Sequence, residues 1–216
     1  MTFTRRTTAL CCAFGLTLSA SACWDDPAPS PAAPAGEDAS PGTGAGTFSS
    51  DTFSVPFDVE IPSWLPADPS AEESHFVTWE STTEDRKVRM LVPVSVYVPG
   101  QAQPTPPPAD YLGYLRSQEA AGASLTDEKA VDLDGRNVTL LTATTDRALD
   151  GDLGCQAEGM AAEDCWGLQP DLLLRIAVIP LDDSTLVAWS RAVRDEPGTE
   201  EQFADFDAMV ASLELR

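Results

Sequence analysis

Three pairs of apolar segments joined by short polar turns constrain the fold of this chain most strongly. In "VDLDGRNVTLL", Asp134-Gly135 separates two runs that alternate apolar and polar residues, a pattern typical of a tight β-hairpin. The other two pairs are residues 74–81 with 85–98 and residues 171–180 with 184–193. Because a hairpin joins antiparallel neighbours, the sequence predicts an antiparallel sheet.

One further alternating segment and a short terminal one complete the expected sheet. Residues 52–61 place their apolar side chains on one face, with Pro56 on the other. Proline cannot donate a ladder hydrogen bond, so we expect this strand to lie at a sheet edge or to carry a bulge. Residues 212–215 can add a short strand at the end. The sequence therefore predicts a sheet of about six or seven strands.

Two helices are expected beside the sheet. Asp110 can cap a helix over residues 111–121, which Gly122 would end. Thr199 and Gln202 have the spacing of a capping box before a second helix with one apolar face. An antiparallel sheet flanked by helices belongs to the α+β class.

The start of the chain has the pattern of an export signal followed by a lipidation site. Arg5 and Arg6 precede a short apolar segment that ends in small residues, which predicts a signal peptide over residues 1–22. "ASAC", residues 20–23, resembles the lipobox of bacterial lipoproteins, whose cysteine is acylated by chains such as palmitate. Lipid on Cys23 would anchor a domain to a membrane without spanning it. The alternative is ordinary signal cleavage, with Cys23 free or paired.

The number of cysteines supports lipidation of Cys23. The chain has five cysteines, of which two would leave with the signal peptide. If Cys23 carries lipid, Cys155 and Cys165 remain and can form one disulfide. A zinc site on these two thiolates would lack a nearby histidine and a second cysteine pair, so the disulfide is the better prediction.

Residues 23–50 are rich in Pro, Ala, Gly and Ser and have almost no bulky apolar side chains, which predicts a disordered tether. A single globular domain is expected over residues 51–216. The chain carries 13 Lys and Arg against 35 Asp and Glu, a net charge of −22. Because such a charge repels phosphate backbones, the sequence argues against nucleic acid as a partner.

The order of these elements resembles the PsbP-like family of α/β/α sandwiches, which includes LpqN-type lipoproteins of actinobacteria. The resemblance is carried by "VDLDGR" leading into a long strand, by the hairpin that follows, and by the closing helix in "FADFDAMVASLEL". It covers residues 51–216 and implies a bacterial, more narrowly an actinobacterial, lipoprotein. It also implies a domain that binds or supports other proteins at membranes, without shared catalytic residues. The segment from Cys155 to Cys165 is an insertion relative to this family.

Two features of the domain are candidate sites. Asp146, Asp150, Asp152 and Glu158 lie close together in the sequence and offer the oxygen ligands that calcium prefers. Their spacing does not match a calcium-binding loop, so a solvated acidic loop is the main prediction, and no metal or cofactor is expected. Trp166 lies in a predicted loop and is the aromatic residue best suited to contact a partner.

These inferences predict a non-catalytic, lipid-anchored protein at the extracytoplasmic face of the cell membrane. Its domain would bind an envelope protein, another envelope component or a small ligand. The single histidine, His75, and the lack of nucleophile motifs argue against an enzyme. Two alternatives remain. One is an envelope hydrolase that uses two converging carboxyl groups, and the other is a structural role in which the sheet edge near Pro56 drives assembly.

Overall fold

The computed structural model describes residues 46–82 and 85–216. The predicted signal peptide, Cys23 and most of the predicted tether lie outside these residues. None of the helices described is long and apolar enough to cross a bilayer. The strands are β1 (Gly46–Ser50), β2 (Phe57–Ile61), β3 (Ala71–Glu72), β4 (Phe76–Glu80), β5 (Lys87–Leu91), β6 (Ala123–Leu133), β7 (Arg136–Thr145), β8 (Leu149–Gly154), β9 (Trp166–Leu168), β10 (Leu172–Pro180), β11 (Thr185–Val193) and β12 (Glu214–Leu215). The helices are α1 (Tyr111–Ser117) and α2 (Thr199–Ala211), with 3₁₀ turns η1 (Gln118–Ala121) and η2 (Ala162–Asp164).

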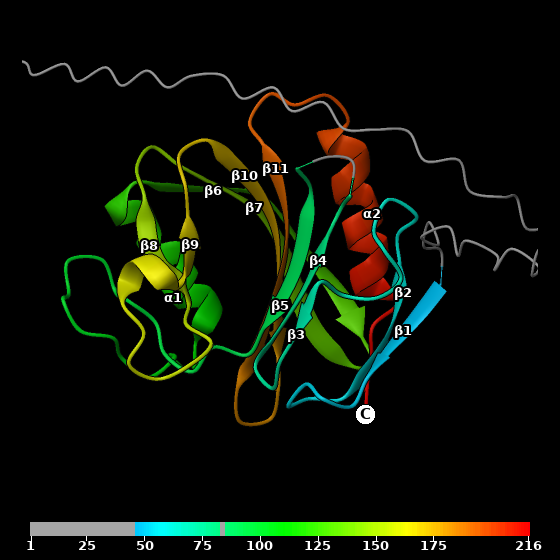
Figure 1. The fold of residues 1–216 in the computed structure, drawn as a ribbon. Coiled ribbons are helices and arrows are strands. Elements are labelled where there is room, and N and C mark those ends of the chain that lie inside the picture. Colours follow the sequence, from blue (N-terminus) through cyan, green and yellow to red (C-terminus); the bar gives the residue numbers. More distant parts are fainter. Residues whose placement is uncertain (1–45, 83–84) are drawn as a thin grey trace, which may run out of the picture. The chain divides into compact units, whose positions relative to one another are not determined.

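Seven antiparallel strands form the main sheet, in the order β3-β4-β5-β11-β10-β7-β6 (Figure 1). The three predicted hairpins are present, because β4 pairs with β5, β6 with β7 and β10 with β11. β5 ends at Leu91, earlier than expected, since Pro93 follows and has no N–H for the ladder. The predicted α+β class and the strand number of the main sheet are confirmed.

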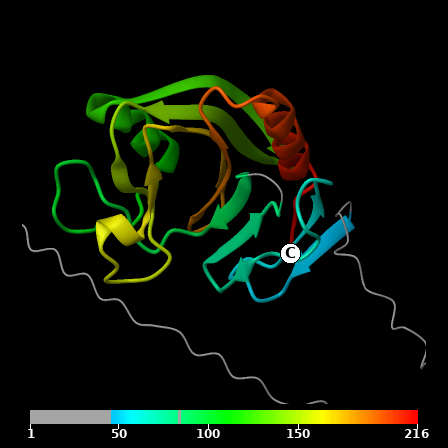
Figure 2. The ribbon, with the colours of Figure 1, turned by 45° about the horizontal axis from the view of Figure 1, so that its top comes forward.

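Alternation along the strands divides the buried side chains between two cores, one on each face of the main sheet. In β4, for example, Val77 and Trp79 belong to one core, whereas Phe76 belongs to the other. α2 and the small sheet β1-β2-β12 contribute to the first core, and α1 and the β8–β9 hairpin contribute to the second. Figure 2 shows these two sets of elements on opposite sides of the main sheet.

The small sheet corrects the expected domain boundary. β1 pairs with β2 over its whole length, from Gly46 opposite Ile61 to Ser50 opposite Phe57. Residues 46–50 are therefore part of the fold, although their composition assigned them to the tether. Pairing with a neighbouring strand outweighs a local composition poor in bulky apolar residues, because the ladder satisfies the backbone groups of β1.

The same sheet overturns the expectation of a free edge near Pro56. β2 begins only after this proline and lies between β1 and β12. The carbonyl oxygen of Pro56 accepts a hydrogen bond of 2.9 Å from the backbone N–H of Arg216. Both sides of β2 are therefore covered, and the assembly alternative loses the edge on which it rested.

The first helix follows its predicted pattern. Asp110 accepts a hydrogen bond of 2.8 Å from the backbone N–H of Gly113, as an N-cap does. Tyr111 and Leu115 are buried on the inner face. α1 passes into η1, which ends where Gly122 adopts the left-handed conformation with φ of 105°.

The second helix forms as expected, but the predicted capping box is wrong. Gly198 precedes α2, and no side chain caps its first turn. The Gln202 side chain is buried against the sheet instead, where its amide donates to Oγ of Ser190 and to the carbonyl oxygen of Arg191, both at 2.8 Å. Hydrogen bonds to buried groups thus take the place of the local cap.

A buried ion pair holds α2 on the sheet. Arg175 of β10 is 8% exposed, and its Nε and Nη2 donate to the two carboxylate oxygens of Asp207 at 2.8 and 2.9 Å. Its Nη1 donates to the carbonyl oxygen of Asp127 and to Oγ1 of Thr142, at 3.1 and 3.2 Å. The guanidinium group is therefore satisfied by α2 together with the sheet.

Candidate functional site

Trp166, the predicted contact residue, packs on the face of the main sheet that α1 covers. Its ring centroid lies 6.1 Å from that of Phe76 and 6.0 Å from that of Trp189. The side chain is only partly buried. Trp166 is therefore part of an aromatic cluster and still reaches the surface.

Two local features hold Trp166 in place. The predicted disulfide between Cys155 and Cys165 is present and ends directly beside it. Gly167 passes so close to β8 that an added Cβ would lie 2.1 Å from the carbonyl oxygen of Leu149. β8 and β9 thus form an antiparallel hairpin where the sequence predicted a loop. The loop prediction is wrong here because glycine and aspartate, which are depleted in strands, hide the pairing.

Arg89 of β5 lies over Trp166, with its guanidinium carbon 4.1 Å from the ring centroid. The strand register places Arg89 opposite Trp189 of β11, so that its side chain lies beside both indoles. The Arg89 side chain is only 11% exposed. A cation over the face of a partly desolvated indole is a favourable contact.

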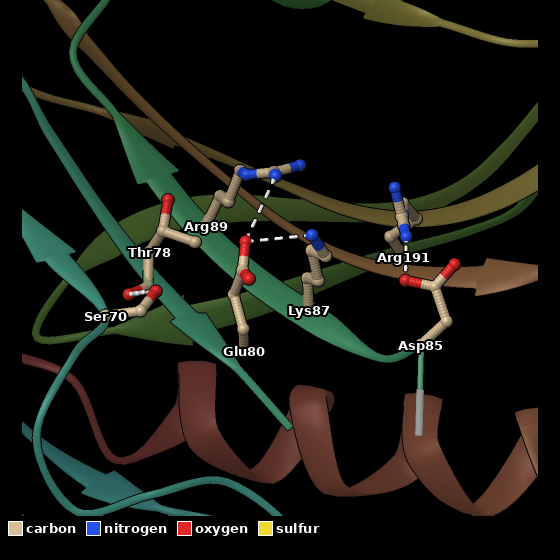
Figure 3. Close-up of polar contacts among 7 residues, drawn as sticks. All are labelled: Ser70, Thr78, Glu80, Asp85, Lys87, Arg89 and Arg191. Atoms are coloured by element: carbon tan, nitrogen blue, oxygen red, sulfur yellow. Dashed lines mark hydrogen bonds and ion pairs between the residues drawn. The ribbon is translucent and has the colours of Figure 1, made fainter. Parts of the chain in front are cut away.

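Three cationic side chains, Lys87, Arg89 and Arg191, lie on the paired strands β5 and β11 (Figure 3). Lys87 lies opposite Arg191 in the strand pairing, and like charges at such positions repel each other. Glu80 accepts a hydrogen bond of 2.9 Å from Lys87 and lies 3.8 Å from Arg89, while Asp85 pairs with Arg191. The two carboxylates offset two of the three positive charges, so this cluster keeps a positive charge within a strongly acidic chain.

The surrounding protein compensates the charges and the hydrogen-bond donors of Arg89 and Arg191 only in part. Burial first, and then the charge of Arg191, lower the pKa of Arg89 to about 10, although Glu80 and Asp85 oppose the shift. Arg89 is still cationic at neutral pH, but its charge is less stable there than in water. The Nε atoms of Arg89 and Arg191 are buried and have no hydrogen-bond partner among the described residues. A bound anion would supply both the charge and the acceptors.

A cavity of about 180 Å³ lies against these groups. Arg89, Arg191, Trp166 and Trp189 line it, together with Gln169. Guanidinium groups bind carboxylate and phosphate through paired N–H donors, and indoles provide flat apolar walls. We call this the Arg89 site. Its residue types suit a compact anionic group with a ring or another flat apolar portion.

The structure does not bring the four acidic calcium candidates together. Asp146, Asp150 and Glu158 are exposed. Asp152 is buried, and its Oδ1 accepts a hydrogen bond of 2.9 Å from the backbone N–H of Leu168. Within residues 46–82 and 85–216, no three histidine, cysteine, aspartate or glutamate side chains are placed to hold a metal ion.

The sequence predicted a contact role for Trp166 but not for the arginines beside it. Alternation was the available signal, since Arg191 follows Trp189 by two residues and so shares its face of β11. The same reasoning cannot show that β5 is the neighbour of β11 or that Arg89 lies opposite Trp189, because that register joins segments about 100 residues apart.

No protein-family model matches this sequence, and no curated protein matches it either. Similar solved structures include the Ran-binding protein Mog1p of Saccharomyces cerevisiae, with 6% identity and a TM-score of 0.45 over 80% of this chain and 96% of that chain. They also include PsbP from the cyanobacterium Synechocystis, with 13% identity and a TM-score of 0.42 over 79% of this chain and 92% of that chain. Similarity at this level assigns neither a family nor a function, and the resemblance to the PsbP-like family stays a prediction.

Proposed function

We propose that this protein is a non-catalytic binding module, held by lipid on Cys23 at the extracytoplasmic face of a membrane, and that the Arg89 site binds an anionic group of an envelope component. The observation that carries the ligand class is the pair of partly buried side chains Arg89 and Arg191, whose buried Nε atoms have no hydrogen-bond partner among the described residues. A local positive charge on an acidic protein favours an anion that fits the site, while other anionic surfaces are repelled.

Titration with phenylphosphate, benzoate and benzyl alcohol tests this site, because the three compounds share one ring and differ in charge. We expect the two anions to bind, and the double variant Arg89→Gln/Arg191→Gln to weaken their binding about 100-fold, since each lost charged hydrogen bond is worth about 1.5–3 kcal/mol. Calorimetry and tryptophan fluorescence measure the affinity. The preferred anion distinguishes phosphate from carboxylate as the natural group.

Arg116→Gln is the matched control, because Arg116 pairs with Glu128 on an exposed surface and does not line the cavity. It should leave the affinity within twofold of the wild type. Trp166→Leu keeps both charges and should weaken binding by about tenfold through the lost stacking. Equal binding of benzyl alcohol, or equal losses in the control and the double variant, would contradict the proposal.

Lipid anchoring rests on the lipobox-like residues that end at Cys23. Cys23→Ala should move the protein from the membrane fraction to the soluble fraction and remove acyl chains from its intact mass. Cys12→Ala is the matched control, since this cysteine belongs to the predicted signal peptide, and it should leave both readings unchanged. A wild-type protein that is soluble and carries no lipid would exclude the anchor.

The hydrolase alternative has weaker support. It requires two carboxyl groups that converge in a cleft. In the described part of the chain, Asp152 is the one aspartate or glutamate that is buried, and its sequence neighbour Asp150 is exposed. One buried carboxyl group suits a binding role better than it suits a two-carboxylate mechanism.

A further inference from the structure

A second, larger cavity of about 570 Å³ lies where the loop after Tyr97 meets η1 and the start of β8. Polar residues on its wall include Gln101, Gln118, Asp150 and Asp152. None of the described residues lines both this cavity and the Arg89 site. We call it the Asp152 cavity.

Asp152 is a buried carboxyl residue on the wall of this cavity, with 1% of its surface exposed. One carboxylate oxygen, Oδ1, is satisfied by the N–H of Leu168. The other oxygen, Oδ2, is buried and has no hydrogen-bond partner in the described structure. A buried acceptor left in this state is costly, so it needs a donor that the surrounding chain does not supply.

Gln118 presents a second acceptor of the same kind. Its side chain is 1% exposed, and its amide nitrogen donates to the carbonyl oxygen of Tyr114 at 3.4 Å. Its Oε1 is buried without a partner among the described residues. Two unsatisfied acceptors on the wall of one cavity indicate a ligand that carries several hydrogen-bond donors.

The charged residues that line the cavity are two aspartates, Asp150 and Asp152, and one arginine, Arg147. Arg147 lies on the rim, where its Nε donates to the carbonyl oxygen of Ala121 at 2.6 Å. The hydroxyl groups of Tyr111 and Tyr114 donate to backbone carbonyl groups and therefore do not serve Asp152. Asp150 adds a negative charge near Asp152.

We propose that the Asp152 cavity binds a small organic ammonium ion, whose N–H groups donate to Oδ2 of Asp152 and Oε1 of Gln118. The positive charge would compensate the buried carboxylate, which is the condition under which such a charge is stable. The net charge of −22 further attracts cations to the protein.

Such binding would depend on pH, because the ammonium ion needs an ionised Asp152. Burial raises the pKa of Asp152 to about 7, with Asp150 adding to the shift and the backbone N–H groups opposing it. Primary ammonium groups are protonated at both pH 6 and pH 8. The affinity should therefore be about tenfold lower at pH 6 than at pH 8, in proportion to the ionised fraction of Asp152.

Calorimetric titration with butylammonium, 1-butanol and butyrate tests the proposal with three probes of similar shape. At pH 8 we expect butylammonium to bind most tightly, and Asp152→Asn to weaken it at least tenfold. Gln118→Leu removes one acceptor without changing any charge and should weaken it about threefold. Asp134→Asn is the control for an exposed charge, since Asp134 does not line this cavity, and it should change the affinity by no more than about twofold.

Every other result of these titrations supports or contradicts the binding of an ammonium ion. Butanol binding as tightly as butylammonium, or an affinity that is the same at pH 6 and pH 8, would overturn the proposal. Equal losses in Asp134→Asn and Asp152→Asn would overturn it too, because they would show only a general attraction of cations. Should Asp152→Asn fail to fold by circular dichroism, Gln118→Leu and the pH comparison on the wild-type protein still give the answer.

Discussion

Asp207→Ala should lower the free energy of unfolding by about 3 kcal/mol, because it leaves the buried guanidinium group of Arg175 without its counter-charge. Two of the four hydrogen bonds of Arg175 go to this carboxylate, and the others go to neutral oxygens. The loss lies at the low end of the range for buried pairs, since Asp207 is itself 25% exposed. Urea unfolding at pH 7 measures the change.

Asp182→Ala is the matched control, because it also removes an aspartate from an arginine pair, but in solvent. The Asp182 side chain is 90% exposed and lies 3.2 Å from Arg136. Its loss should change the stability very little. The double variant Arg175→Met/Asp207→Leu should recover much of the lost stability, since it removes both buried charges together. Equal effects of the two alanine variants would contradict this account of the ion pair.

Asp152→Asn should make the protein more stable at pH 8 by about 2 kcal/mol. The pKa of Asp152 is about 7 in the folded protein and 3.8 as the reference value. Between these pH values the folded chain holds a proton that the unfolded chain releases, so wild-type stability falls as pH rises from about 4 to 7. At 1.36 kcal/mol per unit, the full loss is about 4 kcal/mol, of which an orphaned amide in the variant takes back about 1–2 kcal/mol.

The test is urea unfolding of the wild type and the variant at pH 4, 6 and 8. At pH 4 the variant should be no more stable than the wild type. Its free energy of unfolding relative to the wild type should then increase steadily up to about pH 8. Asp134→Asn should show no comparable change with pH, since Asp134 is exposed and does not line the cavity. A difference between Asp152→Asn and wild type that stays constant with pH would refute the buried, protonated state. If Asp152 is retained for binding a ligand, it is expected to reduce the stability of the fold, so that its replacement stabilises the protein.

The main sheet could be predicted from the sequence because its information is local. Alternation and the Asp134-Gly135 turn specify a hairpin within about twenty residues, and each such hairpin is present. The elements that were missed depend on distant partners. β1 forms only because β2 lies beside it, and Gln202 leaves its capping position because Ser190 lies beneath α2.

In the two cavities, too, some residues could be predicted from the local sequence and others depend on distant parts of the chain. Trp166 could be selected because an aromatic residue stands out in a polar segment. The arginines of the Arg89 site look like ordinary strand residues until the register brings them to Trp166 and Trp189. In the sequence Asp152 is one of four similar acidic residues, yet burial separates it from the other three. No sequence pattern reports how deeply one carboxyl group of a cluster will lie.

β1 also determines how the domain would respond to a pull on the chain before Gly46. Gly46 lies at the end of the ladder with β2, opposite Ile61, and is itself exposed. Tension applied there would separate the backbone pairs one after another instead of shearing all of them together. β2 would stay attached to β12 and to the core. Under such tension β1 would therefore detach and extend first, while the two cavities on the other face of the main sheet keep their shape.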